Sequence, residues 1–228
     1  MSNDSSLSRP NRSLESLFLC LGLALVCAQP DFAMGAAPSM VDFENVPVGT
    51  LFGAAVGNMP GDMVLAQNGI QVSLEPFYLG NFVGFYRAEV GGKYDDYFPS
   101  TPLDLNNISV DFDFTRLGYP VGRVTVDYME FGGSNNLSVN GRSLYELASF
   151  DLLPELVAPG VIASVDQGVL MLEGPIDFVR IGGQELAIDN VLAVPEPASV
   201  LLMIAGGVVP ILCHLRRRRN GVLCASRS

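Results

Sequence analysis

The sequence contains no tryptophan, one histidine and four cysteines, and these scarcities exclude several kinds of chemistry. The four cysteines and the histidine all lie outside residues 29–194: Cys20, Cys27, Cys213, His214 and Cys224. A domain built from residues 29–194 therefore has no disulfide. It also cannot assemble a Ser-His-Asp triad, a Cys-His dyad or a zinc site of His and Cys ligands. Only carboxylate chemistry, or no chemistry, remains for this part of the chain.

Basic residues are also scarce in the central part of the chain. Residues 29–194 contain 6 Lys and Arg but 21 Asp and Glu, a net charge of −15 compared with −11 for the whole chain. Nucleic acid is excluded as a partner, because phosphate binding needs a basic surface. An acidic exterior instead suits solubility and cation binding. The length is enough for one domain with its own core.

The N-terminal residues have the pattern of a secretory signal peptide. Arg9 and Arg12 precede an apolar run over residues 16–28, which ends in Gln29 and Pro30. A short basic region, a short hydrophobic run and small residues at its exit are typical of such peptides. We predict a signal peptide over residues 1–28 and export by the Sec route. The alternatives are an uncleaved anchor or a buried helix.

The C-terminal residues have the pattern of a membrane anchor. An uncharged apolar stretch over residues 198–215 follows a Pro-Glu-Pro triplet and precedes four arginines: Pro195, Glu196, Pro197, Arg216, Arg217, Arg218 and Arg219. The stretch matches the hydrocarbon core of a bilayer, and the arginines favour the cytoplasmic side. The sequence therefore predicts a transmembrane helix over residues 198–215, a cytoplasmic tail over residues 220–228 and a body outside the cytoplasm.

The order Val-Pro-Glu-Pro, apolar span and arginine cluster resembles the PEP-CTERM sorting signal of Gram-negative and related bacteria. The resemblance covers residues 194–219. It implies an exosortase as partner, an integral-membrane cysteine protease-transpeptidase that processes the tail near the triplet. The body would then be released or transferred to the cell surface or extracellular matrix. Two departures from the family pattern are Pro210 and His214 within the span, and the continuation of the chain over residues 220–228.

Between the two ends, the hydrophobic pattern alternates with a period of two. Ile108, Val110 and Phe112 alternate with Ser109 and Asp111, as in a half-buried antiparallel strand. Further strands are predicted at residues 40–45, 69–75, 81–90, 124–128, 137–144, 161–172, 176–181 and 185–193. The Asn-Gly pair at positions 140 and 141 predicts a hairpin turn. One helical turn is expected within residues 143–153. The fold expected for residues 29–193 is all-β, an antiparallel β-sandwich of jelly-roll type.

Two segments resemble the first and last strands of jelly-roll carbohydrate-binding modules. They are residues 41–50 and residues 185–191. The resemblance implies that these strands pair and that acidic residues on them hold a structural calcium. The ligands would be Asp42 or Glu44 together with Asp189. Calcium prefers carboxylate and carbonyl oxygens. The alternative is that these acids are simply solvated at strand edges.

A polar-aromatic segment is the best candidate for glycan contact: Tyr94, Asp95, Asp96 and Tyr97. Aromatic rings stack on sugars and carboxylates accept their hydroxyl groups. The alternative, which we favour, is an ordinary loop anchored by its aromatic residues. A glycoside hydrolase needs a suitably spaced carboxylate pair, and nothing in the sequence singles one out.

The sequence therefore predicts an exported, non-enzymatic surface or matrix protein with a structural or adhesive β-sandwich. It needs no cofactor beyond a structural calcium, and its expected contacts are an exosortase, the inner membrane during export and extracellular polysaccharide. A calcium-stabilised glycan-binding module is the first alternative, and a carboxylate-dependent glycoside hydrolase is a more distant one.

Overall fold

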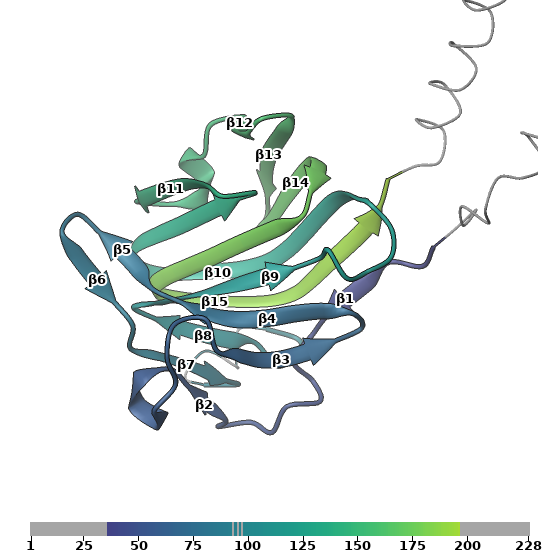
Figure 1. Ribbon diagram of the computed structural model, residues 1–228. Coiled ribbons are helices and arrows are strands. Elements are labelled where there is room, and N and C mark those ends of the chain that lie inside the picture. Colours follow the sequence, from purple (N-terminus) through teal and green to yellow (C-terminus); the bar gives the residue numbers. More distant parts are fainter. Residues whose placement is uncertain (1–35, 93, 95, 97, 197–228) are drawn as a thin grey trace, which may run out of the picture. The chain divides into compact units, whose positions relative to one another are not determined.

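A computed structural model describes residues 36–92, 94, 96 and 98–196, and the protein is all-β over these residues (Figure 1). The strands are β1 (Ser39–Val41), β2 (Leu51–Phe52), β3 (Met63–Gln67), β4 (Ile70–Glu75), β5 (Phe77–Leu79), β6 (Phe82–Gly84), β7 (Arg87–Val90), β8 (Leu103–Asn106), β9 (Ile108–Asp113), β10 (Val121–Val139), β11 (Arg142–Leu147), β12 (Leu156–Ala158), β13 (Val161–Asp166), β14 (Val169–Ile176) and β15 (Phe178–Pro195). Two short 3-10 turns, η1 (Ala54–Val56) and η3 (Phe150–Leu152), lie between strands. The predicted all-β class and the antiparallel pairing are confirmed.

Two long strands organise the sheet. β10 and β15 contain 19 and 18 residues and pair antiparallel from Val121↔Pro195 to Val139↔Val179. On its other edge, β10 pairs first with β14 and then with β11. The other edge of β15 pairs successively with β9, β8 and β1. The remaining strands of the large sheet are therefore joined to β10 or β15, either directly or through a neighbouring strand.

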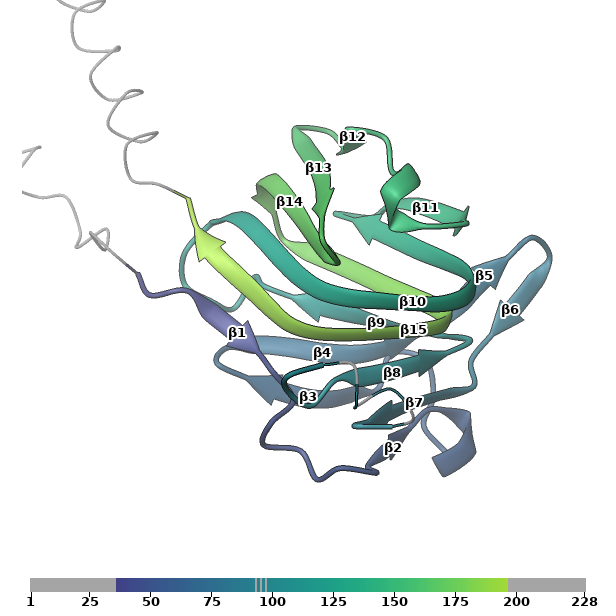
Figure 2. The same ribbon diagram turned by 180° about the vertical axis from the view of Figure 1, so that it is seen from behind.

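The strands that branch from β15 form two facing layers. One branch continues from β9 to β4 and β3, and the other from β8 to β7 and β2. Figures 1 and 2 show the two branches on opposite sides of the domain. Alternate side chains of both branches are fully buried between them, including Val72, Phe112, Leu105 and Val90. The arrangement is sandwich-like, and burial of these apolar side chains drives it.

Paired glycines lie where the long strands pass from one layer to the other. A Cβ atom at Gly182 would collide with the Ser109 hydroxyl, and one at Gly183 would collide with the Leu186 side chain. On β10, Gly132 and Gly133 lie at shifts in the register with β15 and have φ values of 152° and 76°. Glycine tolerates both the close approach and the positive φ, which lets each strand bend without ending.

The Asn-Gly turn was predicted correctly, whereas the helical turn expected within residues 143–153 is present only over its last part. Asn140 and Gly141 connect β10 to β11 with φ values of 50° and 81°, as a two-residue hairpin requires. Residues 142–147 continue as strand β11, and only Phe150–Leu152 forms a single 3-10 turn. Pairing with the C-terminal half of β10 gives β11 backbone hydrogen bonds that a short isolated helix could not match.

A separate hairpin packs near β10 and β11. β5 and β6 form a two-stranded sheet of their own. The Asn136 side-chain amide donates to the Tyr78 carbonyl at 3.0 Å, and the Gly80 amide donates to Glu146 Oε1 at 2.6 Å. Phe77 is fully buried at the base of this hairpin. These contacts attach the hairpin to the main sheet.

No helix within residues 36–92, 94, 96 and 98–196 is long and apolar enough to cross a membrane. The predicted signal peptide (residues 1–28), the transmembrane segment (198–215), the arginine cluster and the tail over residues 220–228 lie outside the described residues, as does Pro197.

Candidate functional site

A group of polar side chains surrounds Asp189, which lies on β15 and has no solvent exposure. Its carboxylate accepts a hydrogen bond from the Ser100 hydroxyl and one of 2.8 Å from the Asn190 amide. The Asn190 side chain in turn donates to Asp127 Oδ2 at 2.9 Å. Asp127 is the residue opposite Asp189 on the neighbouring strand β10. Two carboxylates from paired strands are therefore joined through one asparagine.

Glu44 holds the same loop from the other side. This residue follows β1, and its carboxylate accepts from the Thr101 amide at 2.7 Å and from the Thr101 hydroxyl at 3.2 Å. Ser100 and Thr101 are adjacent in the loop between β7 and β8. Ser100 is thus bound by a carboxylate of the last strand, β15, and Thr101 by a carboxylate that follows the first strand, β1. We call Glu44, Ser100, Thr101, Asp127, Asp189 and Asn190 the Asp189 cluster.

The electrostatic environment of Asp189 disfavours its charge. Burial above all, together with the negative charges of Asp127 and Glu44, raises the pKa of the Asp189 carboxyl to about 6, against the lowering effect of the Ser100 and Asn190 donors. Both of these donors, the Ser100 hydroxyl and the Asn190 backbone amide, are neutral groups. A buried carboxylate near two others normally has a positive partner or takes up a proton. The cluster is therefore suited to bind either a proton or a metal cation.

Of the two residues predicted as alternative partners of Asp189 in a calcium site, Glu44 lies at this cluster and Asp42 does not. Glu44 and Asp189 lie on either side of the same loop, but the Asp42 carboxylate accepts from the Gln67 side chain at 2.6 Å. Within the described part of the chain, no group of three or more Asp, Glu, His or Cys side chains is close enough to hold a metal ion on its own. A cation here would therefore also need hydroxyl, carbonyl or water oxygens, which calcium accepts.

The predicted glycan-contact segment is only partly described. Asp95 and Tyr97 lie outside the described residues, and Asp96 is exposed. The Tyr94 ring is 8% exposed and stacks on the Phe131 ring, with centroids 3.5 Å apart and planes within 7°. Tyr94 therefore anchors its segment against β10, and its ring is not an open platform. Contact of this segment with a glycan stays a prediction.

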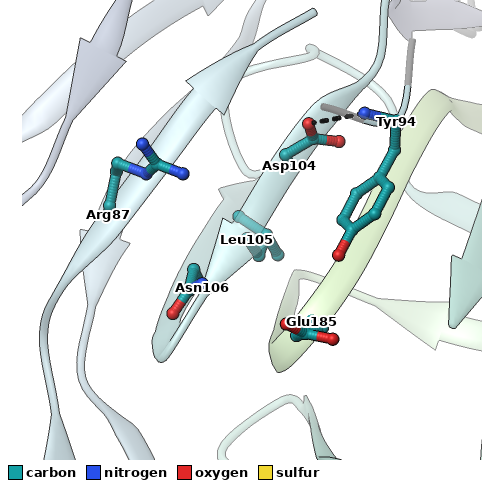
Figure 3. A pocket seen from close by; sticks show the side chains of 6 residues that line it. All are labelled: Arg87, Tyr94, Asp104, Leu105, Asn106 and Glu185. Carbon is teal, nitrogen blue, oxygen red and sulfur yellow. Dashed lines mark hydrogen bonds between the residues drawn. The ribbon is translucent and has the colours of Figure 1, made fainter. Parts of the chain in front are cut away.

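A small pocket lies beside Tyr94 (Figure 3). Its volume is about 30 Å³, and it is lined by Arg87, Tyr94, Asp104, Leu105, Asn106 and Glu185. The Tyr94 backbone amide donates to Asp104 Oδ2 at 3.4 Å, which closes one wall of the pocket. Small-molecule sites usually measure about 300–1,000 Å³, so this pocket accepts solvent or a single small group.

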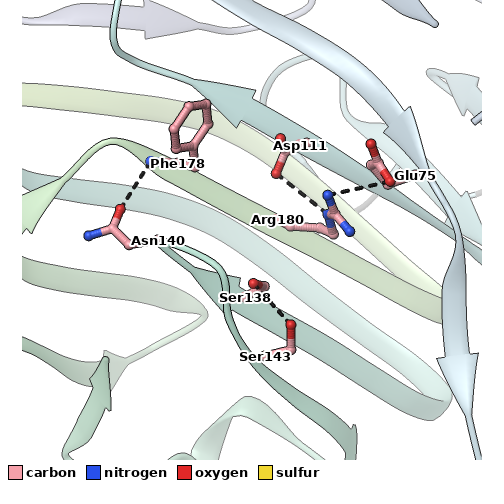
Figure 4. A network of polar contacts seen from close by, with 7 residues as sticks. All are labelled: Glu75, Asp111, Ser138, Asn140, Ser143, Phe178 and Arg180. Carbon is pink, nitrogen blue, oxygen red and sulfur yellow. Dashed lines mark hydrogen bonds and ion pairs between the residues drawn. The ribbon is translucent and has the colours of Figure 1, made fainter. Parts of the chain in front are cut away.

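A second polar network crosses β4, β9 and β15 (Figure 4). The Arg180 guanidinium lies 3.4 Å from Glu75 Oε2 and 3.5 Å from Asp111 Oδ1. Arg180 and Asp111 are opposite residues of paired strands. Burial raises the pKa of the Asp111 carboxyl, Arg180 opposes this effect, and Glu75 reinforces it. One half-buried cation thus compensates two carboxylates, which gives the network a structural role.

The first residue of the predicted sorting motif belongs to the sheet, and the second is hydrogen-bonded beside it. Pro195 is the last residue of β15 and lies opposite Val121. The Glu196 amide donates to the Pro120 carbonyl at 2.9 Å. The body and the motif are therefore continuous, with no spacer between them.

Comparison with protein-family models, with curated proteins and with solved structures gave no match to this chain.

Proposed function

We propose that the chain is an exported protein of the cell surface or extracellular matrix, sorted through its PEP-CTERM-like signal. Three features support the proposal. The apolar N-terminal run precedes the first strand, the Pro-Glu-Pro triplet begins where β15 ends, and the intervening domain is acidic and free of cysteine. The ends of the domain also pair, since Ser39 of β1 lies opposite Ala193 of β15. The segment between the two export signals thus closes on itself as one folded body.

The observation that carries this proposal is the position of the triplet at the end of the last strand. A processing enzyme of the exosortase type would act directly at the border of the folded domain. The body would lie outside the cytoplasm, anchored to the inner membrane until the tail is processed. Cell fractionation tests the proposal: the full chain should reach the surface or medium, and a chain lacking residues 195–219 should not be sorted in the same way. Equal distribution of the two chains would contradict it.

The body itself serves a structural or adhesive role in this proposal, without catalysis. The pocket beside Tyr94 is too small for a sugar or a peptide side chain. The most perturbed carboxylate, Asp189, is enclosed by its own hydrogen-bond partners and is inaccessible to a substrate. Both features favour a passive domain over a glycoside hydrolase, which needs two accessible carboxylates across a cleft.

The finer description of the body is also a proposal: a jelly roll stabilised by calcium. The pairing of β1 with β15 agrees with what the resemblance to carbohydrate-binding modules implies. Glu44 and Asp189 would supply carboxylate oxygens, and the Ser100–Thr101 loop would add further oxygens. Calcium would neutralise the charge that burial makes unfavourable at Asp189. The domain's first strand, last strand and one long loop would then be fastened at a single point.

Glycan binding is the second candidate function, and one surface feature favours it. Tyr78 and Tyr145 form an aromatic pair with ring centroids 5.1 Å apart, and Tyr145 is 45% exposed. Exposed tyrosines of this kind can stack on sugar rings. Retardation of the protein in gels that contain soluble polysaccharides tests this candidate. Tyr145→Ala should abolish any retardation, and Leu152→Ala, which alters another exposed apolar residue, should not.

A further inference from the structure

Residues 195 and 196 of the sorting motif are bound by the domain that precedes them. Pro195 lies opposite Val121, and the Glu196 amide donates to the Pro120 carbonyl at 2.9 Å. Proline has no amide hydrogen, so Pro195 adds no donor to the ladder. The hydrogen bond from Glu196 is therefore the last backbone tie within the described residues.

Gly122 provides the surface on which Glu196 lies. An added Cβ atom at Gly122 would come within 2.9 Å of both Cα and Cγ of Glu196 and within 3.3 Å of its nitrogen. Val121 and Arg123 have strand partners on both sides, and Gly122 lies at a shift in both registers. Its φ is not in the left-handed region, so the backbone here does not itself demand glycine. The absence of a side chain at position 122 is what lets Glu196 dock.

We propose that this docking masks the Pro-Glu part of the sorting motif, so that the folded domain restrains its own processing. The inference rests on the proposed sorting function. Proteases generally bind their substrates as extended chains whose backbone amides and carbonyls are free to pair with the enzyme. The Glu196 amide is already paired with Pro120. The end of β15 must therefore peel from β10 before an enzyme can bind the motif along its length.

The docking is strong enough to slow processing but weak enough to be reversible. A single backbone hydrogen bond and the packing against Gly122 hold Glu196, whereas residues 192 and 193 of β15 pair on both edges, with β10 and with β1. Strand ends with few ties open more often than strand centres. Only the last residues need to open, and the body of the domain stays folded while the motif is exposed.

Gly122→Ala tests the inference in the full-length chain, expressed in cells that process it. The new methyl group should displace Glu196, so hydrogen exchange of the Glu196 amide should accelerate by about fivefold, the equivalent of one backbone hydrogen bond. Pulse-chase labelling should show faster conversion to the shortened product by a similar factor. Gly141→Ala is the matched control: it strains a turn glycine at the opposite end of β10, with φ of 81° and no atom within 4 Å of the added Cβ. This control should lower stability without accelerating processing.

Two results would overturn the masking. One is a Glu196 amide in the unsubstituted protein that exchanges as fast as in an unfolded peptide. The other is a Gly122→Ala protein that loses protection at Glu196 but is processed at an unchanged rate. Either leaves the sorting function standing, because the chain is still shortened. A chain that is never shortened would instead contradict the sorting function, and the masking would fall with it.

Discussion

The Ser100 hydroxyl donates a hydrogen bond to the Asp189 carboxylate across 89 residues of sequence. The bond joins the loop between β7 and β8 to the last strand of the domain. Glu44 binds the next residue of the same loop, Thr101. Two distant carboxylates, Glu44 and the buried Asp189, are thus fastened to consecutive residues of one loop.

Calcium should stabilise the domain through Asp189 and not through Asp42. Millimolar calcium should raise the melting temperature of the protein above its value in EDTA. At a calcium concentration of a hundred times Kd, the free energy of unfolding should increase by roughly 2.7 kcal/mol. Asp189→Asn should remove this increase. Asp42→Asn should retain it, because Asp42 is paired with Gln67. Identical melting curves with and without calcium, for protein shown to be metal-free, would contradict the calcium proposal.

In EDTA, the stability contributed by Asp189 should fall as the pH rises from about 4 to about 6. The pKa of this carboxyl is near 6 in the folded protein and 3.8 without the fold, so the folded state binds more protons in this window. The loss amounts to at most about 3 kcal/mol. Chemical denaturation at several pH values should show this slope, and Asp189→Asn should reduce it. If the unfolding free energy changes with pH by the same amount in both proteins, the pKa of Asp189 is not raised by the fold.

Removing the Arg180 guanidinium should destabilise the domain mainly at neutral pH. Arg180→Met leaves Glu75 and Asp111 without their shared cation, and we expect a loss of about 1 kcal/mol at pH 7 because the network is partly exposed. The loss should shrink at low pH as Asp111, whose pKa is raised, takes up a proton. Urea denaturation measures both values. Arg116→Met, at an exposed loop position, is the control; an equal effect there would show that the network contributes nothing specific.

Gly182 should not tolerate a side chain while Ser109 is opposite it. The Cβ atom of Gly182→Ala would overlap the Ser109 hydroxyl, and the overpacking should cost about 1–3 kcal/mol. Ser109→Gly should recover part of this loss in the double variant, because the Ile108 carbonyl, 3.0 Å from the added atom, remains. A thermodynamic double-mutant cycle measures the coupling. Purely additive effects would mean that the two residues do not meet.

The sequence predicts a strand correctly where apolar side chains of a buried face alternate with polar side chains of the opposite face. Residues 108–113 alternate cleanly and form β9 as expected. The long strands were predicted only as fragments: residues 124–128 and 137–144 for β10, and 176–181 and 185–193 for β15. Glycine pairs at 132–133 and 182–183 interrupt both patterns. A glycine pair occurs both in turns that end a strand and in bends within a continuous strand. Only the tertiary contacts of these pairs decide which of the two structures forms.

The candidate site could be predicted only in part for a related reason. Glu44 and Asp189 were proposed from a resemblance between strand ends, but Asp127 and Ser100 were not. Asp127 falls within an alternating strand pattern, where an acid is expected to face solvent. Its role depends on the pairing of β10 with β15, which joins residues more than sixty positions apart. No local pattern carries such a register.

The intact mass of the mature protein, purified from cells that export it, shows whether the chain is processed at its sorting signal. We expect a chain that has lost residues 1–28 and the segment containing Arg216, Arg217, Arg218 and Arg219, with a new C-terminus near Pro195, Glu196 and Pro197. A mature chain that retains the four arginines would contradict the sorting function and leave a simple membrane anchor in its place.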